Sequence, residues 1–345
     1  MRTLIKITTA ALLSASFISP LFAQDEVNIY SARKEDIIRP LLDAFTKKTQ
    51  IEVNIISGKA DALLNRIVNE AQNSPVDVLL TTDAGRLWRA KQAGVLATVE
   101  SDVLNQLIPA NLRDTDQQWF GLSVRARPIM LSQFYISNTA SEERPHDYSD
   151  LADPKHQNQI CIRSSDNIYN QSLMASVIAN QGEEAALNWA NGLVGNMARK
   201  PQGGDRDQIK AAALGQCGIA IANTYYLASM LAENSPAADK AAAQAMTILW
   251  PNQSTFGAHV NVSGAGVAKH SPNPKNAVAL IEFLASDAAQ EIYANVNFEY
   301  PVRDGIELNS LLQSWGEFKA DTLDLSTLGE LNPKAVMIMD KAGWR

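Results

Sequence analysis

Short apolar segments with strand character alternate with amphipathic helical segments along most of this chain. In the first third, strands are predicted at 27–31, 51–56 and 76–81, and the residues between them carry apolar side chains at helical spacing. The third strand is almost continuously apolar, which is typical of a parallel strand covered on both faces. This alternation predicts an α/β fold in which right-handed crossovers connect the strands of a sheet.

The same alternation resumes in the second half of the chain. An extended segment at 121–131 precedes a polar, turn-rich stretch at 138–158, and another alternating segment follows at 258–268. We expect the first extended segment to carry the chain into a second α/β lobe and the last to return it. A single amphipathic helix is predicted at 276–294. The length of 345 residues suits two lobes with a ligand cleft between them.

These segments divide the chain into four parts. We expect a signal peptide at 1–23, an N-terminal lobe from 24–124 plus about 258–300, and a C-terminal lobe at 125–257. The tail at 301–345 is predicted to form helices that pack on the outside.

The first 23 residues have the pattern of a secretory signal peptide. Arg2 and Lys6 precede a mostly apolar stretch at 10–18, and Ala23 is the expected cleavage site. Removing Arg2 and Lys6 changes the formal net charge from −7 to −9. An acidic exported protein is a poor candidate for binding nucleic acid or an anionic membrane. We therefore expect an exported protein without stable membrane insertion. It is predicted to act as a monomer.

The chain contains two cysteines, Cys161 and Cys217, and each lies in a strand-like segment that leads into a tyrosine-bearing helix. An even pair of cysteines in an oxidising compartment favours a disulfide, which would hold the two strands side by side. The alternative is two buried free thiols.

Two adjacent tyrosines follow one of these strands. After the apolar strand at 219–222, Asn223 and Thr224 have the character of helix-capping residues, which places Tyr225 and Tyr226 in the first turn of a helix. Open α/β sheets bind ligands at this edge, and the positive end of the helix dipole favours a phenolate there. Two such phenols point to a hard, highly charged cation, although half-buried packing residues with hydrated hydroxyls would give the same pattern.

Three strand-to-helix junctions carry groups of this kind, at 30–33, 166–169 and 223–226. A phenol is normally neutral because its pKa is near 10, but a trivalent metal overcomes this by bonding directly to the phenolate. Three phenolates would balance the charge of ferric iron, whereas calcium and magnesium prefer carboxylates and carbonyls.

Arg33, Arg125 and Arg127 need a separate explanation, because guanidinium groups beside a cation require an anion between them. Arginine binds planar carboxylate-like anions through two parallel hydrogen bonds, so carbonate bridging the metal and an arginine would satisfy both. The alternative is that these arginines are surface groups or ion-pair partners.

Several motifs resemble those of the periplasmic ferric-iron-binding proteins of bacterial iron ABC importers, also called bacterial transferrins. The matching stretches are VNIYSAR at 27–33, SPVDVLLT at 74–81, RSSDNIYNQS at 163–172, GGD at 203–205 and AIANTYY at 220–226. The resemblance implies the type II periplasmic-binding fold, with two α/β lobes joined by crossing strands that close on the ligand. It also implies that Tyr169, Tyr225 and Tyr226 are the phenolate ligands of ferric iron, which the protein delivers to an inner-membrane permease.

The sequence departs from this family at one informative place. Many relatives carry His-Tyr just after the Ser-x-Arg element formed here by Ser31 and Arg33, but this chain has Lys34 and Glu35. We expect carbonate held by Arg33 to complete the metal coordination, with Glu35 or water as alternatives. Tyr30 is interpreted as a strand residue rather than a ligand.

Two other functions are alternatives to ferric-iron binding. In one, the same fold binds an organic anion or an anionic metal chelate through Arg33, Arg125 and Arg127, with the tyrosines as stacking walls. In the other, the chain is an exported hydrolase. Its four histidines show no metal-ligand spacing, and no arrangement of nucleophile and general base is visible. We therefore predict a binding protein and not an enzyme.

Overall fold

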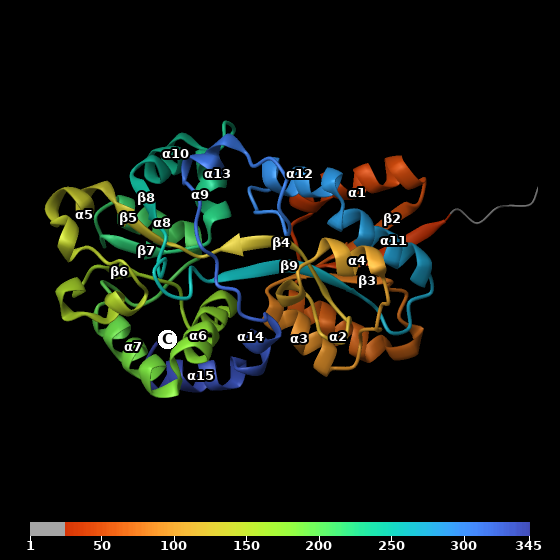
Figure 1. The fold of residues 1–345 in the computed structure, drawn as a ribbon, viewed down its shortest axis with the longest axis horizontal. Coiled ribbons are helices and arrows are strands. Elements are labelled where there is room, and N and C mark those ends of the chain that lie inside the picture. The colour runs from red at the N-terminus through yellow and green to blue at the C-terminus, as the bar shows by residue number, and fades with distance from the viewer. Residues whose placement is uncertain (1–24) are drawn as a thin grey trace, which may run out of the picture.

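The computed structural model describes residues 25–345, and the predicted signal peptide at 1–23 lies outside the described residues. The described chain is a mixed α/β protein with two sheets, which form the two halves seen at right and left in Figure 1. The predicted fold class, two α/β lobes joined by crossing strands, is confirmed. No helix within 25–345 has the length and apolar character to cross a membrane.

The first half is built on a five-stranded sheet with the order β2-β1-β3-β9-β4. β1 is parallel to β2 and β3, whereas β9 is antiparallel to both β3 and β4. Its strands are β1 (Glu26–Ser31), β2 (Glu52–Ser57), β3 (Val78–Thr82), β4 (Phe120–Ala126) and β9 (Val260–Val267). The helices next to these strands in the chain are α1 (Glu35–Thr49), α2 (Ala60–Glu70), α3 (Ala84–Gln92), α4 (Asp102–Leu107), α11 (Pro274–Ala285) and α12 (Asp287–Asn295).

The second half is built on a four-stranded sheet with the order β6-β7-β5-β8. β6 is parallel to β7, and β5 is antiparallel to β7 and β8. Its strands are β5 (Ile129–Ser132), β6 (Ile160–Cys161), β7 (Ile219–Ile221) and β8 (Met246–Leu249). Its helices are α5 (Gln133–Asn138), α6 (Ile168–Gln181), α7 (Glu183–Gly195), α8 (Asp205–Ala213), α9 (Thr224–Leu231) and α10 (Ala237–Gln244).

Short 3-10 helices complete the connections. They are η1 (Ala71–Asn73), η2 (Ala110–Leu112), η3 (Ser141–Glu143), η4 (Ser149–Ala152) and η5 (Pro154–His156).

β4 and β9 lie at the centre of the molecule, where the two halves meet (Figure 1). The chain leaves the first sheet at the end of β4 and enters the second sheet at β5, and it returns through β9. The extended segment predicted at 121–131 is therefore two strands in different sheets, separated by Arg127 and Pro128. Proline has no backbone N–H to donate to a sheet, which is consistent with the break at this position.

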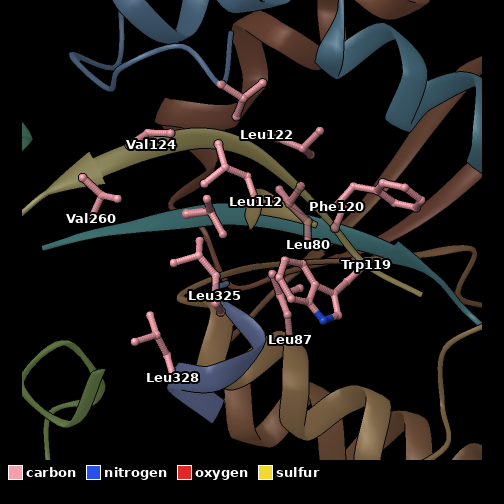
Figure 2. Close-up of a cluster of buried hydrophobic side chains, with 14 of the residues drawn as sticks. Leu80, Leu87, Leu112, Trp119, Phe120, Leu122, Val124, Val260, Leu325 and Leu328 are labelled. Atoms are coloured by element: carbon pink, nitrogen blue, oxygen red, sulfur yellow. The ribbon is translucent and has the colours of Figure 1, made fainter. Parts of the chain in front are cut away.

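Every residue of β4 and β9 is buried, as expected for strands covered on both faces. Figure 2 shows leucines, Trp119 and Phe120 packed around these two strands, together with Leu325 and Leu328 from the C-terminal tail. Gly264 of β9 needs to be glycine, because an added Cβ would lie 2.5 Å from the carbonyl oxygen of Phe120. The close approach of β9 to its neighbour thus depends on the missing side chain.

The C-terminal tail is an integral part of this core. Its helices are α13 (Ser310–Ser314), α14 (Ser326–Glu330) and α15 (Asn332–Lys341). α14 packs against both α3 and α6, which belong to different halves. Trp344 is buried, and its indole N–H donates to the backbone oxygen of Arg163 at 2.9 Å. The tail therefore contributes to the contact between the two halves and fixes the backbone near the start of α6.

The helix predicted at 276–294 is two helices in the structure, α11 and α12. The break falls at Ser286, whose backbone is extended with ψ of 160°. Its hydroxyl donates to the backbone oxygen of Phe283 at 2.6 Å, which satisfies an orphan carbonyl at the end of α11. Apolar spacing alone did not distinguish this arrangement from one longer helix, because only one residue, Ser286, leaves the helical conformation between them.

Candidate metal centre

The tyrosines identified in the sequence lie at the starts of two helices that follow neighbouring strands. β6 and β7 are parallel, with Cys161 opposite Ala220, so the helices that follow them begin at the same edge of the sheet. Tyr169 is the second residue of α6, and Tyr225 and Tyr226 follow Thr224 in α9. The predicted disulfide between Cys161 and Cys217 is present, with the Cα atoms 6.0 Å apart.

Tyr169 and Tyr225 meet at Arg125, which comes from β4 of the other sheet, and Tyr226 packs against Tyr225. One terminal nitrogen of Arg125, Nη2, donates to the hydroxyl of Tyr169 at 3.1 Å and also to the hydroxyl of Tyr225. The Arg125 guanidinium carbon lies 4.8 Å from the Tyr169 ring centre and 4.4 Å from that of Tyr225. The rings of Tyr225 and Tyr226 are 4.2 Å apart. Residues distant in the chain thus form one cluster of phenols on a buried guanidinium.

The three phenols differ in acidity. Burial would raise the pKa of Tyr169, but the Arg125 charge and hydrogen bonds from its neighbours lower it to about 8. Burial raises the pKa of Tyr226 to about 12, and the charges of Tyr169 and Asp205 add to this effect. Burial also raises the pKa of Tyr225 well above its usual value, although Arg125 opposes this. Tyr169 is therefore the phenol that most readily offers a phenolate to a cation.

A buried group on the second half, here called the Asp205 cluster, fixes the starts of the two helices. It comprises Asp205, Arg127, Arg163, Asn170 and Asn223. Asp205 accepts from Arg127 and from Arg163, each at 2.8 Å. Arg127 also donates to the side-chain oxygens of Asn223 at 3.0 Å and Asn170 at 2.7 Å. Asn170 follows Tyr169 and Asn223 lies just before the paired tyrosines, so Arg127 ties both tyrosine-bearing turns together.

This cluster changes the interpretation of Asn223. The sequence predicts that its side chain caps the following helix, but in the structure the side chain makes no capping hydrogen bond. Its oxygen accepts from Arg127 instead, because the guanidinium is a charged donor and such hydrogen bonds are stronger than neutral ones.

A second buried group, here called the Glu299 cluster, lies on the first half. It comprises Glu299, Arg33, Arg125, Ser123 and Ser263. Arg33 donates to both carboxylate oxygens of Glu299, at 2.9 and 3.0 Å, and Ser123 donates to one of them. The Nε atom of Arg125 lies 3.7 Å from Glu299. Ser31 is buried behind Arg33, and its hydroxyl accepts from the Arg33 backbone N–H at 3.1 Å.

The other residues singled out in the sequence lie in different surroundings. Glu35 is exposed in the first turn of α1 and pairs with Arg39, so its role as an additional ligand stays a prediction. The Tyr30 hydroxyl donates to the Glu70 carboxylate, and its ring faces Arg66, which agrees with its interpretation as a strand residue. His259 is buried just before β9, and burial together with Arg127 lowers its pKa to about 3.

The first half also meets the start of α6 directly. The Ser172 hydroxyl donates to Asp83 at 2.7 Å, and the other oxygen of Asp83 accepts from Asn261 at 2.9 Å. Asp83 caps α3 by accepting from the N–H of Gly85 at 2.9 Å. Within residues 25–345, no group of three or more His, Cys, Asp or Glu side chains is arranged to hold a metal ion.

Two residues that organise the site were not assigned a role from the sequence. Asp205 lies in the GGD motif and opens α8 after two glycines, which is a local signal for a helix start. Glu299 follows Phe298, a residue with a φ of 55° in the loop after α12. Nothing in the neighbouring sequence distinguishes Glu299 from an exposed loop carboxylate, because its arginine partners come from distant strands.

The comparison with known families agrees with this architecture. The model of the bacterial extracellular solute-binding proteins matches residues 73–320. The chain belongs to this family.

Individual relatives cover nearly the whole described chain. Iron uptake protein A1 of Synechocystis sp. is 47% identical over 322 residues, which span 93% of this chain and 88% of that protein. A Trichodesmium protein solved in complex with iron and citrate ligands superposes with a TM-score of 0.88 at 46% identity, covering 93% of this chain and 100% of the other. The apo ferric ion-binding protein A of Pasteurella haemolytica gives 0.85 at 43% identity, covering 93% and 98%.

These findings bear on the functions weighed from the sequence. The relatives are named for iron uptake and ferric-ion binding, in agreement with the predicted family. An organic anion held by three arginines is not favoured, because Arg33 and Arg127 already form buried ion pairs with Glu299 and Asp205.

Proposed function

We propose that this chain is a periplasmic solute-binding protein that captures ferric iron and delivers it to an ABC permease in the inner membrane. The observation that carries the proposal is the convergence of Tyr169, Tyr225 and Tyr226 at the starts of two helices, beside Arg125. Iron is the transported substrate, and the protein acts by binding it rather than by chemical conversion.

Charge supports ferric iron as the cargo. Three phenolates carry three negative charges, which balance a tripositive ion. Tyr169 supplies the first phenolate most readily, because Arg125 lowers its pKa to about 8. Each later phenolate forms as the metal displaces its proton, so binding releases protons and strengthens as the pH rises.

We further propose carbonate as a co-bound anion. The sequence assigned it to Arg33, but that guanidinium already donates to both oxygens of Glu299. Arg125 directs Nη2 at the hydroxyls of Tyr169 and Tyr225, so an anion between iron and Arg125 requires no ion pair to break. Carbonate would offer one face to the metal and the other to this guanidinium.

The direct test is titration of the mature protein with ferric nitrilotriacetate in bicarbonate buffer, followed by visible absorption. We expect a phenolate-to-iron charge-transfer band, which Tyr226→Phe bleaches and which Tyr169→Phe and Tyr225→Phe weaken or shift. Tyr30→Phe is the matched control, because its hydroxyl bonds to Glu70 rather than facing Arg125, and it should keep the band. A wild-type protein that stays colourless at saturating ferric iron would overturn the proposal.

A further inference from the structure

Glu299 is the single carboxylate shared by the two arginines of the Glu299 cluster. Its side chain is almost fully buried, and it accepts two hydrogen bonds from Arg33 and one from Ser123, with Ser263 3.5 Å away. Arg125 lies beside it, with Nε 3.7 Å from a carboxylate oxygen. Two buried positive charges therefore share one negative charge, which leaves one net positive charge on this side of the tyrosines.

The backbone holds Glu299 in this position. Tyr300 forms an antiparallel bridge with Val124 of β4, through hydrogen bonds of 2.7 and 2.8 Å between their backbone groups. Val124 lies between Ser123 and Arg125 in the chain. The bridge therefore places Glu299, which precedes Tyr300, next to Ser123 and Arg125. Burial disfavours the charged carboxylate, but Arg33 and Arg125 hold the pKa of Glu299 below its usual range.

Glu299 reduces the positive charge that Arg33 and Arg125 together would place near a bound cation. A guanidinium repels a tripositive ion at short range in a site of low dielectric constant. Glu299 cancels the charge of Arg33 behind Arg125, so one net positive charge rather than two faces the phenol cluster. Its carboxylate lies 3.7 Å from Nε of Arg125, while Nη2 of the same guanidinium contacts the tyrosine hydroxyls.

We propose that Glu299 is a positioning and charge-balancing residue of the iron site, which cancels the charge of Arg33 so that Arg125 can lie beside ferric iron. This inference rests on the proposed function and adds a residue that contacts neither the phenols nor the cargo. It predicts that the charge of Glu299, and not only its shape, affects the affinity for ferric iron and the reduction potential of the bound iron.

The experiment begins with wild-type protein, because failure to bind ferric iron would overturn the proposed function and not this inference alone. Glu299→Gln keeps the shape of the side chain and removes its charge. We expect at least a ten-fold weaker affinity for ferric iron in competition with nitrilotriacetate. The reduction potential of the bound iron should become more positive, since an added net positive charge favours the ferrous ion. Glu299→Asp should recover most of the affinity and the potential.

A double variant separates charge from structure. Arg33→Met with Glu299→Gln removes one positive and one negative charge, so the net charge beside the tyrosines equals that of the wild type. Its potential should return toward the wild-type value, whereas a merely structural role would leave it at least as perturbed as in Glu299→Gln. The double variant also lets the test proceed if Glu299→Gln does not fold, because it leaves no unpaired charge from the Arg33–Glu299 pair.

Asp77→Asn is the matched control for removing a buried carboxylate. Asp77 accepts from backbone N–H groups of Asn28 and Asn273, both at 2.7 Å, and lies outside both clusters. Its variant should keep the wild-type affinity and potential even if it lowers stability. The inference is overturned if Glu299→Gln binds ferric iron with wild-type affinity and potential, or if the single and double variants shift the potential equally.

Discussion

The Asp205 cluster and the Glu299 cluster have the same composition at their centres but differ in what their arginines contact. Each contains two arginines that share one buried carboxylate, and all of these arginines are buried except Arg163, which is half-buried. In the Asp205 cluster, both terminal nitrogens of Arg127 donate to protein acceptors at the starts of α6 and α9. In the Glu299 cluster, Nη2 of Arg125 donates only to the tyrosine hydroxyls.

This difference indicates a division of roles. The Asp205 cluster fixes the spacing of the two tyrosine-bearing turns, because Arg127 donates to Asn170 and Asn223, which lie next to those tyrosines. The Glu299 cluster supplies a guanidinium whose remaining contacts are with the phenols themselves. A carboxylate shared by two arginines can thus position helices in one place and balance the charge of a binding site in another.

The largest expected effect comes from Asp205→Ala. Its removal leaves Arg127 and Arg163 without a shared carboxylate in a buried position, which should lower the free energy of unfolding by about 3–5 kcal/mol. Urea unfolding of the iron-free protein measures this loss. Glu183→Ala, which breaks the exposed pair with Lys334, is the control and should change stability by less than about 1 kcal/mol. A loss of similar size in both variants would contradict the architectural role.

The disulfide offers the next test, because it links the strands that precede the two tyrosine-bearing helices. Replacing both Cys161 and Cys217 by serine releases a cross-link between residues separated by 56 positions. The entropy model predicts a loss of up to about 4 kcal/mol in unfolding free energy. The Asp205 cluster should still hold the tyrosines together, so the folded variant should keep its ferric charge-transfer band. Loss of the band from a folded variant would assign the spacing to the disulfide instead.

His259 lies near Arg127 of the Asp205 cluster and should make the free energy of unfolding depend on pH. Burial and Arg127 lower its pKa to about 3 in the folded state, against an ordinary value of 6.5. The unfolded chain therefore binds a proton that the folded chain does not as the pH falls through this interval. The stabilising contribution is complete above about pH 6.5 and decreases toward pH 3, by at most about 1.4 kcal/mol per pH unit. Urea unfolding between about pH 7 and pH 4 should show a shallower decline for His259→Asn than for the wild type, and parallel declines would refute this assignment.

The smallest effect is expected at Ser172, which donates to Asp83 across the contact between the two halves. Asp83 accepts hydrogen bonds from the neutral donors Ser172, Gly85 and Asn261. Ser172→Ala removes one of them and should lower the free energy of unfolding by about 1 kcal/mol. Ser141→Ala, at an exposed hydrogen bond, is the control and should change stability by less than about 0.5 kcal/mol. If removing the Ser172 hydroxyl lowered the free energy of unfolding as much as Asp205→Ala does, the proposed difference between the two contacts would be wrong.

Local sequence patterns were enough to predict the elements that present the tyrosines. Strand, turn and helix signals are local, so Tyr169, Tyr225 and Tyr226 could be assigned to helix starts at one sheet edge. The two-lobe fold and the disulfide followed from alternation and from the export signal. Local signals did not distinguish one long helix from two consecutive helices. The single helix predicted at 276–294 is two helices in the structure, separated at Ser286.

The role of each arginine follows from the folded arrangement and could not be predicted from local sequence. Arg125 and Arg127 are two residues apart and were treated alike, but β4 ends at Ala126. Arg125 therefore belongs to the first sheet and faces the phenols, whereas Arg127 enters the second half and meets Asp205. Arg33 and its partner Glu299 are 266 positions apart. Such pairings depend on how the folded strands bring distant charges together, and no local pattern in the chain encodes that arrangement.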